Sequence, residues 1–263
     1  MTDDALKDLL KNLELLPAMA KRLEAMRPES EAEKGLASDG KVSPPAAKPP
    51  IWPEIDPLLY VHVTPQDIVF DIGANVGKHS QIFAGIGART HAFEPNPQLA
   101  EKLRQKFQNT SVTIHEVALS DTVGEATFYL DTRPEMPAVA SSLRLLADLH
   151  AAGKTEAINV KTDTLDEVVR KTGDHPTFIK IDVEGHEPAV FAGGRQTIET
   201  YRPRIIFELW GSHFARFEGT FDWLHPMYHL VRVSDGIDAY DFYKTKADPK
   251  GCDIIALPRP GIV

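Results

Sequence analysis

The chain has 263 residues, of which 42% are hydrophobic and 25% charged, with a formal net charge of −9. This composition is typical of a soluble globular protein, and the acidic balance argues against a broad nucleic-acid surface. The single cysteine, Cys252, excludes an internal disulfide and a cysteine metal cluster. No apolar run approaches the ~18 residues of a membrane span, and no signal-peptide apolar region stands at the N-terminus. We therefore expect a cytoplasmic protein.

Residues 1–27 carry leucines at the three- and four-residue spacing of an amphipathic helix, which Pro17 should kink or divide. Docking on the main domain or pairing with another subunit suits its mixed charges better than a membrane surface does. Residues 28–50 are rich in proline, alanine and charge, which predicts a flexible linker. The main domain is then expected to span residues 51–263.

The first strong signal is an apolar run, Ile68 to Phe70, followed by glycines. A parallel strand covered on both faces loses the alternating pattern, so this run predicts a buried strand. Gly73 and Gly77 permit a tight turn with positive φ and a close approach of the backbone to a ligand. Residues 78–84 can form a helix whose free N–H groups point back into the turn. Together these features predict the first half of a nucleotide-binding βαβ unit.

The turn has the spacing Asp-x-Gly-x-Asn-x-Gly, from Asp71 through Asn75 to Gly77. Dinucleotide-binding proteins need G-x-G-x-x-G instead, which argues against a nicotinamide-dependent oxidoreductase. Asp71 would repel a pyrophosphate and suits a ligand that carries an amine. Glycines at strand-to-helix turns are also common for packing alone, so the turn by itself is weak evidence.

Residues 89–93 predict the next strand, and Glu94 stands at its end. Glu94 follows the glycine turn at about the ~20-residue separation expected of a carboxylate that binds ribose hydroxyls. The plain alternative is an exposed glutamate in a loop. Asn96 as N-cap and Pro97 at the first helical position then begin a helix.

Residues 112–117 predict a third strand, which ends at residues 118–121. Ligands of α/β sheets sit at the carboxyl ends of the strands, which makes Ser120 and Asp121 candidates for the edge of an adenine. A turn built from serine and aspartate explains the same pair nearly as well.

Residues 125–130 and 158–161 predict two extra edge strands. The segment between them, 131–155, has the length of an insertion that recognises substrate. Residues 164–167 form a capping box that opens the next helix.

The second chemical signal is an apolar central strand, residues 178–181, with titratable groups at its mouth. Asp182 is placed to receive a proton or to hold an amine of the ligand, and Glu184 follows on the turn. Lys180 is placed to lower a neighbouring carboxylate's pKa or to polarise a substrate hydroxyl. His186 has an ordinary pKa suited to general-base work, and a surface histidine at a turn is an equally good reading of it.

Residues 204–210 predict a fifth strand with Glu208 at its outer end, and residues 228–233 and 253–257 predict an antiparallel hairpin that closes the sheet. Aromatic side chains are concentrated just before and within this hairpin. They form either a lid over an acceptor pocket or ordinary packing, which is the commoner outcome. They are His213, Phe214, Phe217, Phe221, Trp223, His225 and Tyr228.

Five motifs, in this order, resemble the FkbM methyltransferases: Asp71 to Gly77, Phe93 to Pro95, Ala118 to Asp121, Lys180 to Gly185 with Glu187, and Pro203 to Glu208. The resemblance implies a class I fold that binds S-adenosyl-L-methionine: an α/β, doubly wound, mostly parallel, Rossmann-like seven-stranded sheet with an antiparallel C-terminal hairpin. It also implies O-methylation of a sugar, glycan or polyketide-like acceptor. The resemblance further implies a role for each motif residue. Asp71, Gly73, Asn75 and Gly77 would line the methionine and ribose side of the cofactor, and Glu94 would bind the ribose. Ser120 and Asp121 would lie near the adenine, and Asp182 would face the reacting centre.

The mechanism expected is an in-line displacement in which proximity supplies much of the rate. Asp182, Glu184 or His186 would accept the hydroxyl proton. A divalent ion held by Asp182 and Glu208 is a minority alternative, because no third ligand is evident. Two other classes remain open: a nicotinamide-dependent oxidoreductase and a non-catalytic nucleoside-binding module.

Overall fold

The computed structural model describes residues 56–132, 141–142, 154–209, 216–245 and 252–260. The expected N-terminal helix and linker, the insertion apart from β6 (Ser141–Ser142), and residues 210–215 lie outside this part of the chain. The chain divides into two compact units after Val61. Helix α3 (Asp56–His62) spans the division, and every element considered below belongs to the unit that begins at His62.

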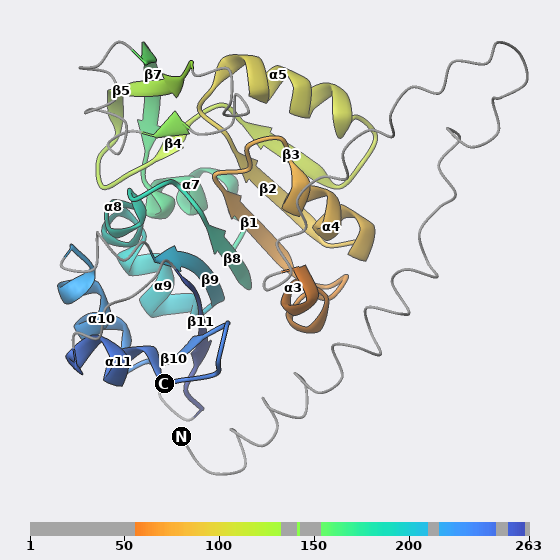
Figure 1. The fold of residues 1–263 in the computed structure, drawn as a ribbon. Helices are drawn as coiled ribbons and strands as arrows, with labels where there is room; N and C mark the ends of the chain where they lie inside the picture. Colours follow the sequence, from red (N-terminus) through yellow and green to blue (C-terminus); the bar gives the residue numbers. More distant parts are fainter. Residues whose placement is uncertain (1–55, 133–140, 143–153, 210–215, 246–251, 261–263) are drawn as a thin grey trace, which may run out of the picture. The chain divides into compact units, whose positions relative to one another are not determined.

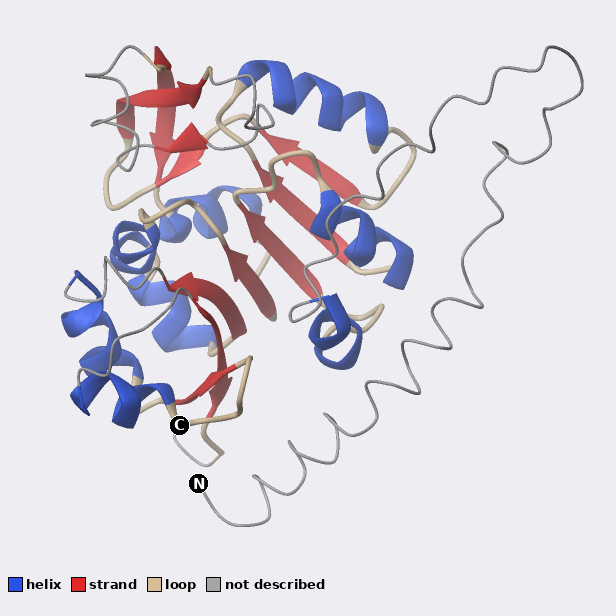
Figure 2. Ribbon diagram, viewed as in Figure 1, coloured by secondary structure: helices blue, strands red, loops and turns tan. Residues whose placement is uncertain are grey.

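A seven-stranded sheet with the order β10-β11-β9-β8-β1-β2-β3 forms the frame (Figures 1 and 2). Five neighbouring strands are parallel, and the two last ones in the chain pair antiparallel, as expected. The parallel strands are β1 (Ile68–Ile72), β2 (Arg89–Phe93), β3 (Val112–His115), β8 (Phe178–Ile181) and β9 (Arg204–Leu209), and the others are β10 (Tyr228–Arg232) and β11 (Cys252–Pro258). The expected doubly wound architecture is confirmed.

Helices cover both faces of this sheet. On one face Leu103 and Phe107, from the region of α5, pack with Ala74 and Ala92. On the other face the larger core joins strand side chains such as Ile179 with helix side chains from α7, α8 and α9. The helices are α4 (Lys78–Ile86), α5 (Pro97–Lys106), α7 (Leu165–Thr172), α8 (Glu187–Gly193), α9 (Arg195–Tyr201), α10 (Glu218–Leu224) and α11 (Ala239–Thr245).

The helix starts follow from their capping residues. The side chain of Asn96 accepts hydrogen bonds from the N–H groups of Gln98 and Leu99, as expected of the N-cap of α5. Thr164 caps α7 by accepting from the N–H of Glu167. These caps fix the first turn of α5, which follows β2, and the first turn of α7, which precedes β8.

A second, four-stranded sheet corrects the prediction for residues 112–163. The third strand ends at His115, and Ala118–Leu119 forms a separate strand, β4. β5 (Gly124–Asp131) and β7 (Thr155–Asp163) are not edge strands of the main sheet, because each pairs along its length with the other and β4 adds to β7. Backbone hydrogen bonds between β5 and β7 therefore take the place of pairing with β3.

The described members of the aromatic group near the C-terminus are packing rather than a lid. Phe217, Phe221 and Tyr228 are fully buried in the larger core, and the rings of Phe207 and Phe217 stack 6.0 Å apart. His213 and Phe214 lie outside the described residues. Within the described ranges, no helix has the length and apolar character needed to cross a membrane.

Candidate active site

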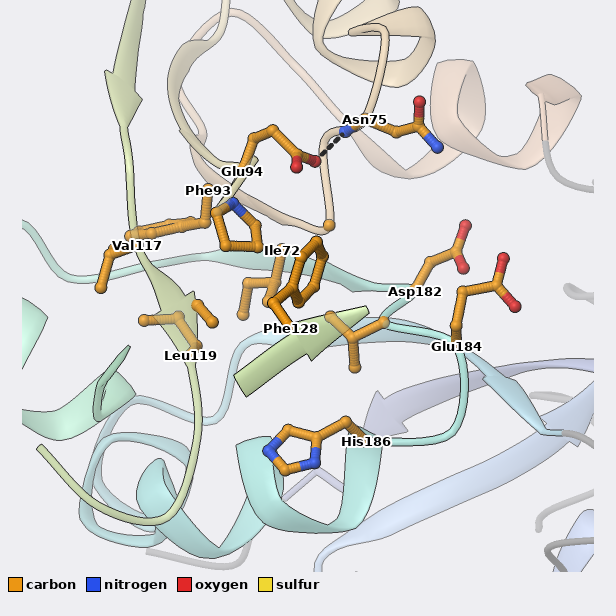
Figure 3. A pocket seen from close by; sticks show the side chains of 14 residues that line it. Ile72, Asn75, Phe93, Glu94, Val117, Leu119, Phe128, Asp182, Glu184 and His186 are labelled. Atoms are coloured by element: carbon orange, nitrogen blue, oxygen red, sulfur yellow. Dashed lines mark hydrogen bonds between the residues drawn. The ribbon is translucent and has the colours of Figure 1, made fainter. Parts of the chain in front are cut away.

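A pocket opens at the carboxyl ends of β1, β2 and β8, where the sheet order predicts a ligand site (Figure 3). It encloses ≈ 600 Å³, counting the part open to solvent. Its lining residues are Ile72, Gly73, Asn75, Phe93, Glu94, Pro95, Val117, Ala118, Leu119, Phe128, Asp182, Val183, Glu184 and His186. The pocket thus brings together both chemical signals of the sequence.

The glycine turn is shaped by contacts within the protein. Gly73 has φ 82°, and its N–H donates to the carbonyl oxygen of Phe93 at 3.1 Å. A Cβ added at Gly73 would lie 1.8 Å from the carbonyl oxygen of Asp182, so only glycine allows the ends of β1 and β8 to approach this closely. A Cβ at Gly77 would lie 2.5 Å from Leu103, so Gly77 serves helix packing and does not line the pocket.

Asp71 and Lys180 form a buried pair beneath the pocket. Asp71 is fully buried and accepts a hydrogen bond from Ser80 at 2.5 Å. Nζ of Lys180 lies 3.7 Å from Asp71 and 3.2 Å from Asp182, and it donates to the carbonyl oxygen of Gly73 at 3.1 Å. Burial alone would lower the pKa of Lys180, but the two carboxylates outweigh it and raise the pKa. Neither Asp71 nor Lys180 lines the pocket.

Glu94 faces the pocket and is held by the backbone on both sides. One carboxylate oxygen accepts from the N–H of Asn75 at 2.9 Å (Figure 3). The other accepts from the N–H of Asn96 at 2.9 Å. Each oxygen keeps a further lone pair for a ligand. Burial raises the pKa of Glu94 to about 7, although both N–H groups favour the ionised form.

A second group of carboxylates lies where β8 runs into α8. Asp182 and Glu184 line the pocket and lie side by side at its edge in Figure 3. Burial, together with Asp182 and Glu187, raises the pKa of Glu184 to about 7. Glu184 has φ 56°, which a glutamate rarely adopts. The turn is held by Glu187, whose carboxylate accepts from the N–H groups of Val183 at 3.0 Å and Gly185 at 3.1 Å.

His186 lines the pocket from the N-cap position of α8. Its Nε2 lies 2.9 Å from Oγ of Ser120, and Ser120 donates to the carboxylate of Asp121 at 3.1 Å. When the single hydroxyl hydrogen of Ser120 goes to this carboxylate, which only accepts, Nε2 carries a hydrogen and donates to Ser120. Neither Ser120 nor the exposed Asp121 lines the pocket.

An apolar wall completes the pocket, and part of it was not found in the sequence. Phe93, Pro95 and Leu119 come from the segments that the motifs indicate. Phe128 comes from β5 in the second sheet and is buried. No local pattern marked Phe128, because its place depends on the pairing of β5 with β7.

The metal alternative gains no support in the part of the chain that the structure describes. No group of three or more His, Cys, Asp and Glu side chains there has the arrangement of a metal site. Glu208 lies on β9 opposite Asp253 and is not among the pocket residues, so it does not join Asp182 there.

Comparison with known proteins gives one family match and several relatives. The family model described as "Methyltransferase FkbM domain" matches residues 71–232. The hexuronic acid methyltransferase AglP of Haloferax volcanii is 28% identical over 57% of this chain and 59% of its own length. The 31-O-demethyl-FK506 methyltransferase FkbM of Streptomyces tacrolimicus is 32% identical over 51% of this chain and 61% of its own length. The 2-O-methyltransferase NoeI of Sinorhizobium fredii is 28% identical over 52% of this chain and 61% of its own length. The chain thus spans about three-fifths of the length of each relative.

Proposed function

Since the chain belongs to the family of FkbM methyltransferase domains, we propose that it is an O-methyltransferase that uses S-adenosyl-L-methionine. The acceptor proposed is a hydroxyl of a sugar, glycan or polyketide-like molecule. The names of the three relatives support this class, since each is a methyltransferase and two are named for transfer to oxygen. The observation that carries the proposal is the buried, backbone-held carboxylate of Glu94 beside the glycine turn.

The residues present fit the proposed cofactor. Glu94 offers acceptor lone pairs of the kind that ribose hydroxyls need. The apolar wall of Phe93, Leu119 and Phe128 suits the face of an adenine. Asp182 and Glu184 offer negative charge to a positively charged sulfur. This donor set supports a cationic nucleoside better than an anionic one.

When bound, S-adenosyl-L-methionine supplies a methyl group whose bond to sulfur breaks, leaving the electron pair on sulfur, as the acceptor oxygen bonds to the methyl carbon. The residues of the chain hold the acceptor in line and take the hydroxyl proton. We assign the proton to Glu184, because its pKa of about 7 is matched to a base working near neutrality. The carboxylate of Asp182 is instead paired with the ammonium of Lys180, which lies 3.2 Å away.

His186 is assigned to orienting the acceptor. It lines the pocket from the N-cap position of α8, so an acceptor bound there lies against its ring. A hydroxyl lying between this ring and Glu184 would direct its single hydrogen to the Glu184 carboxylate, which takes the proton.

Thermal unfolding in the presence of ligands tests the proposal, because a ligand of the native state raises the apparent melting temperature. We expect stabilisation by S-adenosyl-L-methionine and S-adenosyl-L-homocysteine and none by NAD. Glu94→Ala should weaken the binding of both by about ten-fold or more, since it removes a charged hydrogen-bond acceptor. Glu101→Ala, at an exposed position on α5, is the matched control and should bind as wild type does. Stabilisation by NAD alone would contradict the proposal and indicate a nicotinamide-dependent oxidoreductase instead.

A further inference from the structure

A second pocket lies directly beside the first and shares His186 with it. It encloses ≈ 480 Å³, counting the part open to solvent. It is lined by Gly185, His186, Pro188, Ala189 and Arg216. A molecule in this second pocket would therefore lie against the same imidazole that borders the first pocket.

The two pockets differ in charge. Glu94, Asp182 and Glu184 line the first pocket. Among the described residues that line the second pocket there is no carboxylate, and the guanidinium of exposed Arg216 is the one full charge. Within the described ranges no carboxylate forms an ion pair with Arg216, whereas Arg195 and Arg204 have Glu199 and Asp67. Arg216 thus offers a planar set of donors to a molecule in this pocket.

We propose that the second pocket holds the methyl acceptor and that Arg216 binds an anionic group on it. This assignment rests on the proposed function and names its substrate class: a hydroxylated molecule that also carries a carboxylate or a similar oxyanion. Arg216 suits such a group because a guanidinium binds a carboxylate through two parallel hydrogen bonds.

Charge also fixes the direction in which this acceptor lies. The carboxylates of Asp182 and Glu184 repel an anion, and the guanidinium of Arg216 attracts it. The anionic end therefore takes the Arg216 side, and the hydroxyl reaches past His186 toward Glu184. A neutral acceptor has no such preference and lacks the charge-assisted part of the contact with Arg216.

The test compares two probes that differ only at one carbon: methyl β-D-glucopyranosiduronate, with a carboxylate, and methyl β-D-glucopyranoside, with a hydroxymethyl group. Binding of each is measured by calorimetry on protein saturated with S-adenosyl-L-homocysteine. We expect wild type to bind the uronate at least about ten-fold more tightly, as a charge-assisted hydrogen bond gives. Arg216→Gln should remove this preference by weakening the uronate alone, and Arg216→Lys should keep part of it.

Arg195→Gln is the matched control, because Arg195 is exposed on α9 over the ring of Trp223 and lies outside both pockets. It should keep the full preference. Equal binding of the two probes by wild type, no binding of either, or an Arg216→Gln variant that still prefers the uronate would each overturn the proposal. Binding of S-adenosyl-L-homocysteine is measured first and separately, and its absence would contradict the proposed function. Failure of the Arg216 proposal is therefore distinguishable from failure of the proposed function.

Discussion

The hydroxyl oxygen of Ser120 lies 2.9 Å from Nε2 of His186, although 66 residues separate the two in the sequence. The contact joins the end of β4 to the N-cap of α8, and a Cβ at Gly193 of the same helix would lie 2.0 Å from the carbonyl oxygen of Ser120. Because Ser120 also donates to Asp121, it selects the ring form of His186 that carries hydrogen on Nε2.

Ser120→Ala should therefore change His186 and leave cofactor binding unchanged. We expect nitrogen NMR of the histidine rings to show His186 as the Nε2–H form in wild type and to show that preference lost in the variant. The dissociation constant of S-adenosyl-L-homocysteine should stay within about two-fold, since Ser120 does not line the pocket. Unchanged NMR with a large loss of affinity would instead support the adenine contact that the sequence suggested for Ser120.

Gly73→Ala and Gly85→Ala should have opposite effects on stability. Alanine at Gly73 places a Cβ 1.8 Å from a backbone oxygen and at φ 82°, which should cost roughly 2–4 kcal/mol in the free energy of unfolding. Gly85 lies in α4 with no atom within 4 Å of the added Cβ, so alanine there should stabilise by about 1 kcal/mol. Urea unfolding of the two variants measures both. Equal stabilities would show that the ends of β1 and β8 do not approach as described.

Binding of S-adenosyl-L-methionine should release protons near pH 7, and S-adenosyl-L-homocysteine should release fewer. The pKa values of Glu94 and Glu184 are each raised to about 7, so both are partly protonated in the empty pocket. A positive charge beside them favours the ionised form and lowers both pKa values, and only the methylated ligand carries that charge on sulfur. Calorimetry in two buffers of different ionisation enthalpy counts the protons. Glu184→Gln should shrink the difference between the ligands, and equal counts in wild type would contradict the carboxylate assignment.

Stability should fall in mild acid because of a histidine pair on neighbouring strands, His91 on β2 and His115 on β3. Nε2 of His115 lies 2.9 Å from Nδ1 of His91, whose Nε2 lies 2.9 Å from Asp174. Burial, and then the charge of His91, lower the pKa of His115 to about 4 from an ordinary 6.5. The unfolded chain then binds the proton first, so stability is full above pH 6.5 and declines toward pH 4, by at most about 1.4 kcal/mol per pH unit.

His115→Gln should make that decline shallower while keeping a hydrogen-bonding side chain on β3. Urea unfolding at pH 7.5, 6.5, 5.5 and 4.5 measures the slope. A residual slope should remain, because burial also lowers the pKa of His62 to about 4. Identical slopes for wild type and variant would show that His115 titrates as it does in the unfolded chain.

The sequence was most informative where local chemistry decides structure. A glycine at positive φ after an apolar run, as at Gly73, and an N-cap before proline, as at Asn96, are local signals, and both predictions are confirmed. The strand β2 and the pocket position of Glu94 followed from them. The spacing of residues along the chain is enough to predict a site when the elements that form it are neighbours in both sequence and space.

The sequence did not predict which motif side chains are buried, nor which of the two sheets each strand joins. Asp71 and Lys180 stand beside pocket residues in the motifs, yet their side chains point into the interior between the strands and pair with each other. Strand periodicity does not say which of two sheets a strand joins, and this is why Phe128 was missed as a pocket residue. Both facts depend on pairing between distant segments.

The enclosed ammonium of Lys180 also bears on the order of folding. It touches Asp71 and the carbonyl of Gly73, 107 residues earlier in the chain. An intermediate that desolvated β8 before β1 arrived would bury this ammonium without Asp71 and without the Gly73 carbonyl, with half-exposed Asp182 as its nearby counter-charge, and such burial costs free energy. We therefore expect the two central strands to dock together, and the ligand-binding turn to become ordered with them.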